Sequence, residues 1–285
     1  MKRIIFVLGV FLIITSSVAQ SKVQSDLNIM TYNIRYDNPD DGLNNWKFRK
    51  ENALNMIRFN EVDILGMQEV LVNQLNDIKG QLPEYESIGV GRDDGKEKGE
   101  YSPILFHKNK FTLIESGYFW LSETPDKPSK GWDAACERIA TWIILKDKTT
   151  EKKVFVMNTH FDHIGQKARQ ESVNLIKTKM AQLGKGLPQI FMGDLNADPN
   201  SSVITSLLTT EKSIAFLDSK SRALVVYGPS WTFHDFGKIP FKDRPLIDYI
   251  LVNKEILVHK YGVLAENLNE TYLSDHAPVC VKISL

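Results

Sequence analysis

Short apolar runs alternate with amphipathic segments along most of this chain. Apolar runs of strand length cover residues 27–34, 62–68, 153–161 and 188–194. Apolar residues recur at helical spacing in three segments that follow such runs, residues 46–60, 71–82 and 165–183. We therefore predict strand–helix–strand steps, which are typical of an α/β protein.

Other apolar runs follow one another with no helical pattern between them. They cover residues 85–90, 103–107, 111–121, 138–145, 246–252, 256–264 and 277–283. Meanders in both halves, together with the helix-linked strands, predict two packed sheets with helices outside them. No Ser-, Gly- or Pro-rich linker separates the halves, so we expect a single domain over residues 21–285. The segments 91–100 and 122–137 show no such pattern and are predicted to be long loops, which often carry function.

The first twenty residues differ from the rest. Lys2 and Arg3 precede an apolar run from Ile4 to Ile14, and small residues follow as far as Ala19. This order is typical of a secretory signal peptide, and the run is shorter than the roughly 20 apolar residues that span a bilayer. We expect residues 1–20 to be removed. The mature protein would then have no transmembrane anchor and would be periplasmic or extracellular.

Composition narrows the class of protein. The chain has 285 residues, with 35 basic and 35 acidic side chains and 42% hydrophobic residues, which excludes a disordered or disulfide-stapled protein. Removing the first twenty residues leaves 33 basic against 35 acidic side chains, so the surface offers little general attraction to a nucleic-acid duplex. The only two cysteines, Cys136 and Cys280, either pair in an oxidising compartment or remain buried thiols.

Polar residues stand at the ends of several apolar runs, where packing alone gives no reason for them. They are Asn33, Glu69, His160, Asp194, Asn196, Asp248, Asp275 and His276. Each has a structural explanation when taken singly, such as a turn or the first turn of a helix, so it is the joint pattern that indicates a site. Asp248 lies in an apolar run, and its charge is costly to bury unless it is hydrogen-bonded or paired with a cation, for which a histidine would serve.

Several carboxylates near one another repel unless a cation or a proton lies between them. Carboxylate and amide oxygens suit hard ions, so we expect Mg²⁺ or Mn²⁺, with Ca²⁺ as a third candidate. A zinc cluster of His160, Asp162 and His163 is less favoured, because neighbouring residues on a strand point to opposite faces.

In this order along the chain, the segments MTYNIR, MQEV, NTHFDH, GDLNADP, IDYIL and SDHAPV resemble the endonuclease/exonuclease/phosphatase superfamily, whose deoxyribonuclease I-like fold is shared by exonuclease III, inositol polyphosphate 5-phosphatases and neutral sphingomyelinases. The sequence is most similar to small exported bacterial members. The resemblance implies a four-layer α/β/β/α sandwich of two mixed β-sheets and metal-dependent hydrolysis of a phosphate ester. It also implies that Glu69 is the principal metal ligand, with Asn33 and Asp275 close to the metal or its waters.

The resemblance assigns the other polar residues to catalysis. Asp194 and Asn196 would position the attacking water and a phosphate oxygen. His276, oriented by Asp248, and His160 would contact the phosphate. These roles agree with the needs of phosphoryl transfer, which are charge neutralisation and in-line placement of water.

Substrate choice lies in the loops, which the motifs do not specify. We expect a small-molecule or glycan-linked phosphodiester. The alternatives are a secreted nuclease acting on DNA or RNA, a lipid or sugar phosphate hydrolase of the sphingomyelinase or phosphatase type, and a non-catalytic binding module. No obligate protein partner is evident, and nucleic acid is not favoured as a substrate.

Three loop residues are candidates for substrate binding. Arg92 and Arg138 could each bind phosphate through the guanidinium fork, or could form ion pairs within the protein. Trp132 could stack on a sugar or a base, or could pack its loop onto the sandwich. If Arg92 is a ligand, Arg92→Ala should raise the KM.

Overall fold

The computed structural model describes residues 26–209, 214–268 and 271–285, so the predicted signal peptide lies outside the described residues. The helices are η1 (Pro39–Asn44), α1 (Trp46–Phe59), α2 (Val72–Gln81), α3 (Gln166–Leu183), α4 (Ser202–Leu208), α5 (Ser219–Arg222) and η2 (Phe241–Asp243). The strands of the first half are β1 (Asp26–Asn33), β2 (Ile64–Gln68), β3 (Tyr85–Ile88), β4 (Ile104–His107), β5 (Phe111–Trp120) and β6 (Ile139–Asp147). The remaining strands are β7 (Lys153–His160), β8 (Gln189–Asp194), β9 (Leu217–Asp218), β10 (Val225–Tyr227), β11 (Asp248–Val252), β12 (Leu257–Val263), β13 (Asn267–Leu268), β14 (Thr271–Tyr272) and β15 (Val279–Ser284).

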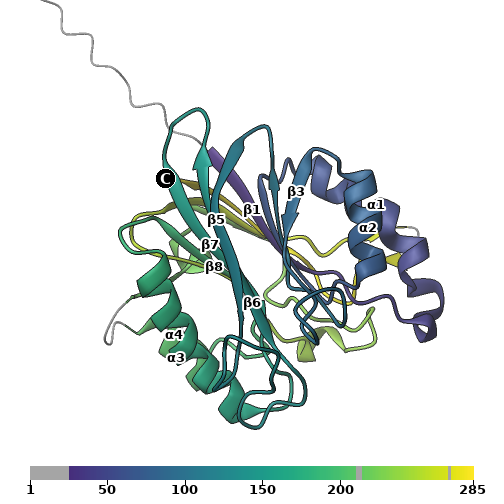
Figure 1. Cartoon of the computed structure of the whole chain (residues 1–285). Helices are drawn as coiled ribbons and strands as arrows, with labels where there is room; N and C mark the ends of the chain where they lie inside the picture. The colour runs from purple at the N-terminus through teal and green to yellow at the C-terminus, as the bar shows by residue number, and fades with distance from the viewer. Residues whose placement is uncertain (1–25, 210–213, 269–270) are drawn as a thin grey trace, which may run out of the picture.

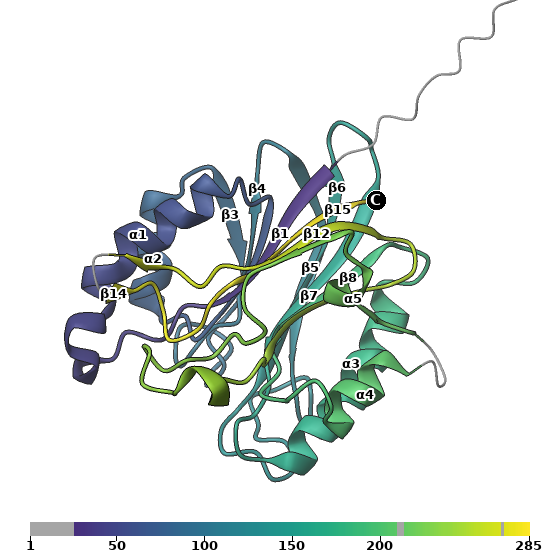
Figure 2. The same cartoon turned by 180° about the vertical axis from the view of Figure 1, so that it is seen from behind.

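The strands form two large mixed sheets that pack face to face. One sheet has the order β10-β12-β15-β1-β2-β4-β3 and the other has the order β5-β6-β7-β8-β11-β9. Helices α1 and α2 cover the outer face of the first sheet, and α3 and α4 cover the outer face of the second (Figure 1). The view from behind shows the same layers (Figure 2). The predicted four-layer α/β/β/α sandwich is therefore confirmed.

Alternation along the strands explains why each sheet is buried on both faces. In β7, Val154 and Val156 enter the core between the two sheets, while Phe155 and Met157 pack under α3 and α4. Side chains of successive residues point to opposite faces of a sheet, so a continuous apolar run such as KVFVM fills two cores at once. The same strand thus provides side chains both for packing between the sheets and for packing against the helices.

The strand register brings the predicted site residues together. Asn33 pairs with Gln68 across the parallel strands β1 and β2, which places it beside Glu69. His160 pairs with Asp194 across β7 and β8, and Asp248 pairs with Asp194 across β8 and β11. Ends of strands from both sheets therefore present polar side chains at the same level.

The long predicted strands and helices agree with the structure within one or two residues at most ends, while the short elements after residue 194, such as α4 and β10, have no counterpart in the periodic pattern. The segments 91–100 and 122–137 contain no helix or strand, as expected. Among the described residues, no helix combines the length and the hydrophobicity that crossing a bilayer requires.

Candidate active site

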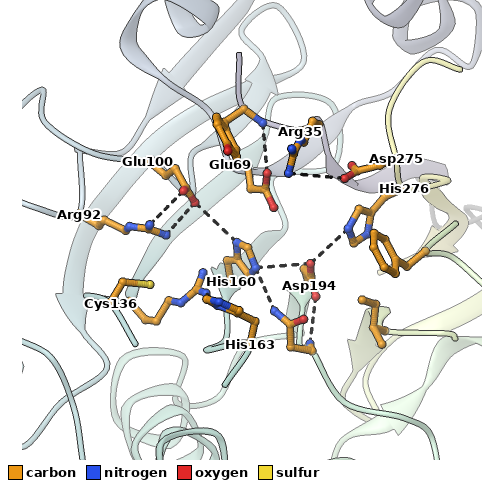
Figure 3. Close-up of a pocket in the computed structure, with 15 residues that line it drawn as sticks. Arg35, Glu69, Arg92, Glu100, Cys136, His160, His163, Asp194, Asp275 and His276 are labelled. Atoms are coloured by element: carbon orange, nitrogen blue, oxygen red, sulfur yellow. Dashed lines mark hydrogen bonds and ion pairs between the residues drawn. The ribbon is translucent and has the colours of Figure 1, made fainter. Parts of the chain in front are cut away.

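A pocket of about 290 Å³ opens where the strand ends of both sheets meet (Figure 3). The residues that line it are Arg35, Tyr36, Glu69, Arg92, Glu100, Cys136, Arg138, His160, His163, Asp194, Asn196, Phe233, Ile247, Asp275 and His276. Asn33 and Asp248 are buried and hydrogen-bond to lining residues. All eight polar residues predicted from the strand ends thus gather in or directly behind one pocket.

Asn33 joins the two sheets at the base of this site. Its Nδ2 donates to Glu69 Oε1 at 3.0 Å, on its own sheet, and to Asp194 Oδ2 at 3.1 Å, on the other. Its Oδ1 accepts from the Arg35 backbone N–H at 3.0 Å. Asn33 therefore orients two carboxylates.

Glu69 has a left-handed backbone, with φ of 61°. This turn at the end of β2 directs the carboxylate toward the strand ends, where the Tyr36 backbone N–H donates to Oε2 at 3.2 Å. A non-glycine residue in this conformation is uncommon, and such strain clusters at functional sites.

Asp194 lies between two histidines. Its Oδ2 is 3.5 Å from His160 Nε2 and 3.7 Å from His276 Nε2, and its Oδ1 accepts from the Asn196 backbone N–H at 2.9 Å. Burial, followed by the charge of Asp248, raises the pKa of Asp194 to about 7, although the charge of His276 opposes this rise. The carboxylate is thus held where a substrate and a water would meet.

His276 and Asp248 form a buried ion pair. Nδ1 of His276 lies 2.9 Å from Asp248 Oδ2, and the Asp248 backbone N–H donates to Thr232 Oγ1. Burial disfavours the charged imidazole, but Asp248, through its charge and this hydrogen bond, and Asp194 outweigh it and raise the pKa of His276 to about 10. The pair presents a cationic Nε2 toward Asp194. His276 is thus a cationic partner of the kind expected for the buried Asp248.

His160, in contrast to His276, is uncharged. Burial and the nearby charges of Arg138 and Arg92 hold the pKa of His160 well below its usual value, so the imidazole is neutral. Nδ2 of Asn196 donates to His160 Nε2 at 3.0 Å, which leaves the proton on Nδ1. That nitrogen faces Glu100 Oε2 at 4.0 Å, and it has no hydrogen-bond partner among the described residues.

The acidic groups near Glu69 fit a divalent cation. Burial raises the pKa of Asp275, and the Glu69 charge raises it further, although His276 and Arg35 oppose the effect. Arg35 Nη1 is 3.8 Å from Asp275 Oδ2, which is too far for a hydrogen bond. Buried carboxylates that the protein's own cations neutralise incompletely favour a bound metal ion, and oxygen donors suit Mg²⁺ or Mn²⁺.

A second acidic cluster lies close by. Asp194, Asp248 and His276 offer ligand atoms that all lie within 4.8 Å of one another, so this buried group could also bind a metal. His276 already supplies a positive charge between the two carboxylates, however. We therefore place the metal ligands at Glu69 and Asp275, with Asn33 beside them.

The three candidate substrate-binding residues lie in different environments. Arg92 lines the pocket, but its two terminal nitrogens bond to Glu100 at 2.7 and 2.9 Å. Arg138 lines the pocket and is 4% exposed. Trp132 is not among the lining residues. Its backbone N–H donates to Glu123, and φ is 51°.

Sequence reasoning missed several residues of the pocket wall. Arg35, Glu100 and His163 belong to loops, and only Arg35 and His163 lie inside quoted motifs, MTYNIR and NTHFDH. Cys136 also lines the pocket, and it and Cys280 are both free thiols. The two long loops predicted from the sequence could have indicated these residues. Segment 91–100 contains Glu100, and segment 122–137 contains Cys136 and ends directly before Arg138.

Among the described residues, His160, Asp162 and His163, the less favoured zinc cluster, do not come together as one group of ligands. Asp162 accepts backbone N–H groups of Ala135, Ile164 and Gly165, and Arg138 approaches it at 3.4 Å. Cys136, Asp162 and His163 do have ligand atoms within 4.8 Å of one another. Because the Arg138 guanidinium contacts both Asp162 and His163, a positive charge already occupies this cluster.

Comparison with known proteins agrees with this geometry. The sequence model of the endonuclease/exonuclease/phosphatase family matches residues 30–276. A crystal structure of an endonuclease/exonuclease/phosphatase from Bacteroides vulgatus is 45% identical, with a TM-score of 0.89, over 92% of this chain and 99% of that one. A Bacteroides thetaiotaomicron structure described as a mannosyl-6-phosphatase is 40% identical, with a TM-score of 0.84, over 90% of this chain and 99% of that one. An uncharacterized protein of Acanthamoeba polyphaga mimivirus is 27% identical over 83% of this chain and 91% of its own length.

Proposed function

Because this chain belongs to the endonuclease/exonuclease/phosphatase family, we propose that it hydrolyses a phosphate ester of a sugar or another small molecule, with Mg²⁺ or Mn²⁺ as its cofactor. The family places it among the phosphoester hydrolases. The identity of the ester and of the metal is the proposal, and so is export to the periplasm or the cell exterior, which rests on the sequence of residues 1–20.

The size and lining of the pocket carry the proposal. Its volume of about 290 Å³ is at the lower end of the roughly 300–1,000 Å³ that is usual for small-molecule sites. Three histidines, three arginines and four carboxylates line it, together with Phe233 and Ile247. A compact pocket of this kind suits a phosphate carried by one small group better than a nucleic-acid duplex.

The relative described as a mannosyl-6-phosphatase supports a sugar phosphate. At 40% identity over nearly the whole of both chains, it favours a monoester over the diester expected from the sequence. The phosphodiester and the nuclease reactions remain the alternatives that experiment must separate.

The residues of the site divide the work of hydrolysis. Asp194, held by Asn33 and by the Asn196 N–H, orients a water and accepts its proton. The cationic Nε2 of His276 stabilises charge on the phosphate, and Asp248 fixes the orientation of the imidazole. A divalent ion held by Glu69 and Asp275 would supply further charge stabilisation there.

The other side of the phosphate faces two uncharged groups, the Asn196 amide and the His160 imidazole. Asn196 has φ of 46°, and this turn directs its side-chain amide to His160 and to the Phe161 carbonyl. His160 is neutral and carries its proton on Nδ1. The neutral imidazole thus adds no further charge beside a dianionic phosphate.

The test is hydrolysis by purified residues 21–285. Mannose 6-phosphate, p-nitrophenyl phosphate, bis-p-nitrophenyl phosphate and plasmid DNA are incubated with Mg²⁺, with Mn²⁺ and with a chelator. We expect phosphate release from the monoesters that needs metal and falls at least 1,000-fold in Asp194→Ala, because the residue that orients the water is lost. The plasmid should remain intact.

Other outcomes would change the assignment. Preferential cleavage of bis-p-nitrophenyl phosphate with intact plasmid would restore the small phosphodiester, and nicking of the plasmid would restore the nuclease. Equal turnover in Asp194→Ala and wild type would mean that this pocket is not the active site.

A further inference from the structure

Arg138 has one guanidinium nitrogen without a partner. The residue stands directly before β6, lines the pocket and is 4% exposed. Its Nε lies 3.4 Å from Asp162 Oδ2, and its Nη2 lies 2.8 Å from His163 Nδ1. Among the described residues, Nη1 is buried and makes no hydrogen bond. A buried donor without an acceptor is energetically costly, so an acceptor that enters the pocket gains by binding there.

The protein holds Arg138 in this position firmly. Asp162 is 2% exposed and accepts backbone N–H groups of Ala135, Ile164 and Gly165 at 3.1, 2.9 and 2.6 Å. The carboxylate is therefore fixed by the loop before β6 and by the start of α3. It anchors the guanidinium in turn, so Arg138 cannot turn away from a bulky ligand without breaking these contacts.

Arg92 lacks this property. Both of its terminal nitrogens already bond to Glu100, which places the two charges in a bidentate pair. Its Nε is buried and makes no hydrogen bond among the described residues, and it lies 3.8 Å from Asp93 Oδ1. Of the two arginines proposed from the sequence, only Arg138 has a terminal nitrogen that makes no hydrogen bond among the described residues.

The position of Arg138 selects the part of the phosphate that it contacts. Figure 3 shows Cys136 and His163, its neighbours, on one side of His160, with Asp194 and His276 on the other. A phosphate that lies against Asp194 and His276 would have one non-bridging oxygen left to face the Arg138 side of the pocket. In a monoester this oxygen is a terminal one and carries negative charge. In a diester it carries a second alcohol.

We propose that Arg138 binds this terminal oxygen through Nη1 and thereby makes the enzyme selective for phosphate monoesters over diesters. The inference rests on the proposed function and specifies its substrate class. A diester would place an alkyl or aryl group against the guanidinium and leave Nη1 unpaired. Sites built to hydrogen-bond a substrate group reject analogues that lack it far more strongly than apolar pockets reject a methyl group.

The test compares two substrates that differ by one methyl group. p-Nitrophenyl phosphate and methyl p-nitrophenyl phosphate release the same alcohol, and the second has its terminal oxygen blocked. We expect Arg138→Gln to lower kcat/KM for the monoester roughly 100-fold and to change that of the diester less than about 3-fold. Arg138→Lys keeps the charge but loses the fork, and should restore only part of the monoester activity.

Two controls separate this role from a structural one. Arg222→Gln removes an exposed guanidinium of α5 that does not line the pocket, so both kcat/KM values should stay unchanged. Binding of inorganic phosphate, measured by calorimetry with and without Mn²⁺, provides a readout that does not need turnover. Its Kd should rise at least 10-fold in Arg138→Gln, whereas binding of dimethyl phosphate should not change.

The outcomes distinguish this inference from the proposed function. If the wild type hydrolyses neither ester, the proposed function fails, and the phosphate titration alone decides the role of Arg138. If Arg138→Gln lowers both kcat/KM values by the same factor, or binds phosphate as the wild type does, Arg138 does not read the terminal oxygen. If Arg138→Gln does not fold, the same comparison in Arg138→Lys decides, since equal effects on both substrates would overturn the inference.

Discussion

At the scale of single residues, two histidines of one chemical type hold opposite charge states within one pocket. His276 is cationic because Asp248 and Asp194 flank it, and His160 is neutral because burial, with no carboxylate bonded to it and with arginines nearby, lowers its pKa. The protein thereby places a charge on one side of the phosphate and a neutral imidazole on the other. Local partners decide these states, since both side chains are buried to a similar extent.

The Asp248–His276 pair gives a test of this principle. In Asp248→Asn, the carboxylate that holds the imidazolium is lost, and we expect the pKa of His276, followed by NMR in the metal-free protein, to fall from about 10 toward its usual range. The kcat should fall on the order of 10²–10⁴-fold, as in hydrolases whose histidine loses its aspartate. Asp243→Asn, an exposed change in η2, is the matched control. An unchanged pKa of His276 would contradict the assignment.

The sequence predicted the polar residues at the strand ends but not the whole wall of the pocket. Asn33, Glu69, Asp194 and His276 stand out because each interrupts or ends an apolar run, where a polar side chain has an energetic cost. Glu100 and Cys136 lie in loops, where polar residues are ordinary. Only the folded path of a loop brings such residues to a site, and no periodicity records that path.

At the scale of elements, close contact between β7 and β8 positions the candidate catalytic residues His160 and Asp194. Gly193 has φ of 149°, and a Cβ built there would lie 2.0 Å from the carbonyl oxygen of Thr159 on the neighbouring strand. Glycine is therefore required for the two strands to pair up to their ends. A side chain at this position would push apart the strands that carry the two catalytic residues.

Gly193→Ala should therefore lower both stability and activity. We expect a loss of more than about 3 kcal/mol in the free energy of unfolding, because the clash involves backbone that cannot rotate away. Chemical denaturation measures this loss. Gly80→Ala in α2 is the control, since a Cβ there meets nothing within 4 Å and helix propensity favours alanine. Equal midpoints for wild type and Gly193→Ala would refute the packing argument.

Element types were predictable to the extent that periodicity was strong. The long helix α3 and the strand β7 differ from their predicted bounds by a residue at most ends, because apolar spacing and burial coincide there. The helix α4 follows a turn-rich segment and has only seven residues, too few for a period to emerge. The strand β10 has three exposed residues, so burial leaves no pattern in it.

At the scale of the whole molecule, a buried polar bridge connects the two sheets below the active site. Gln68 Nε2 donates to Asn158 Oδ1 at 2.6 Å and to Thr31 Oγ1 at 3.0 Å. Asn158 Nδ2 donates to the carbonyl oxygens of Met67 and Pro103, which belong to the other sheet and its loop. This network fixes how the sheets align, because apolar packing alone tolerates small shifts.

Removing the bridge should destabilise the sandwich strongly. Asn158→Ala removes three buried hydrogen bonds, to the Met67 and Pro103 carbonyl oxygens and from the Gln68 amide, so we expect a loss of about 2–4 kcal/mol in the free energy of unfolding. Urea denaturation would measure the loss. Asn174→Ala, on the exposed face of α3, should change stability by less than about 0.5 kcal/mol. Similar values for both variants would show that the bridge contributes little to the alignment of the sheets.

Asn33 bonds to Glu69 on one sheet and to Asp194 on the other, so the rate of turnover should depend sensitively on how the two sheets align. A slip of one sheet past the other by about 1 Å would leave the strands, the helices and their spectroscopic signals almost unchanged, yet such displacements cost enzymes on the order of 100-fold in rate. On heating, turnover would therefore decline before circular dichroism reports any melting. The temperature gap between the two curves would measure how far the halves of the sandwich loosen while each is still folded.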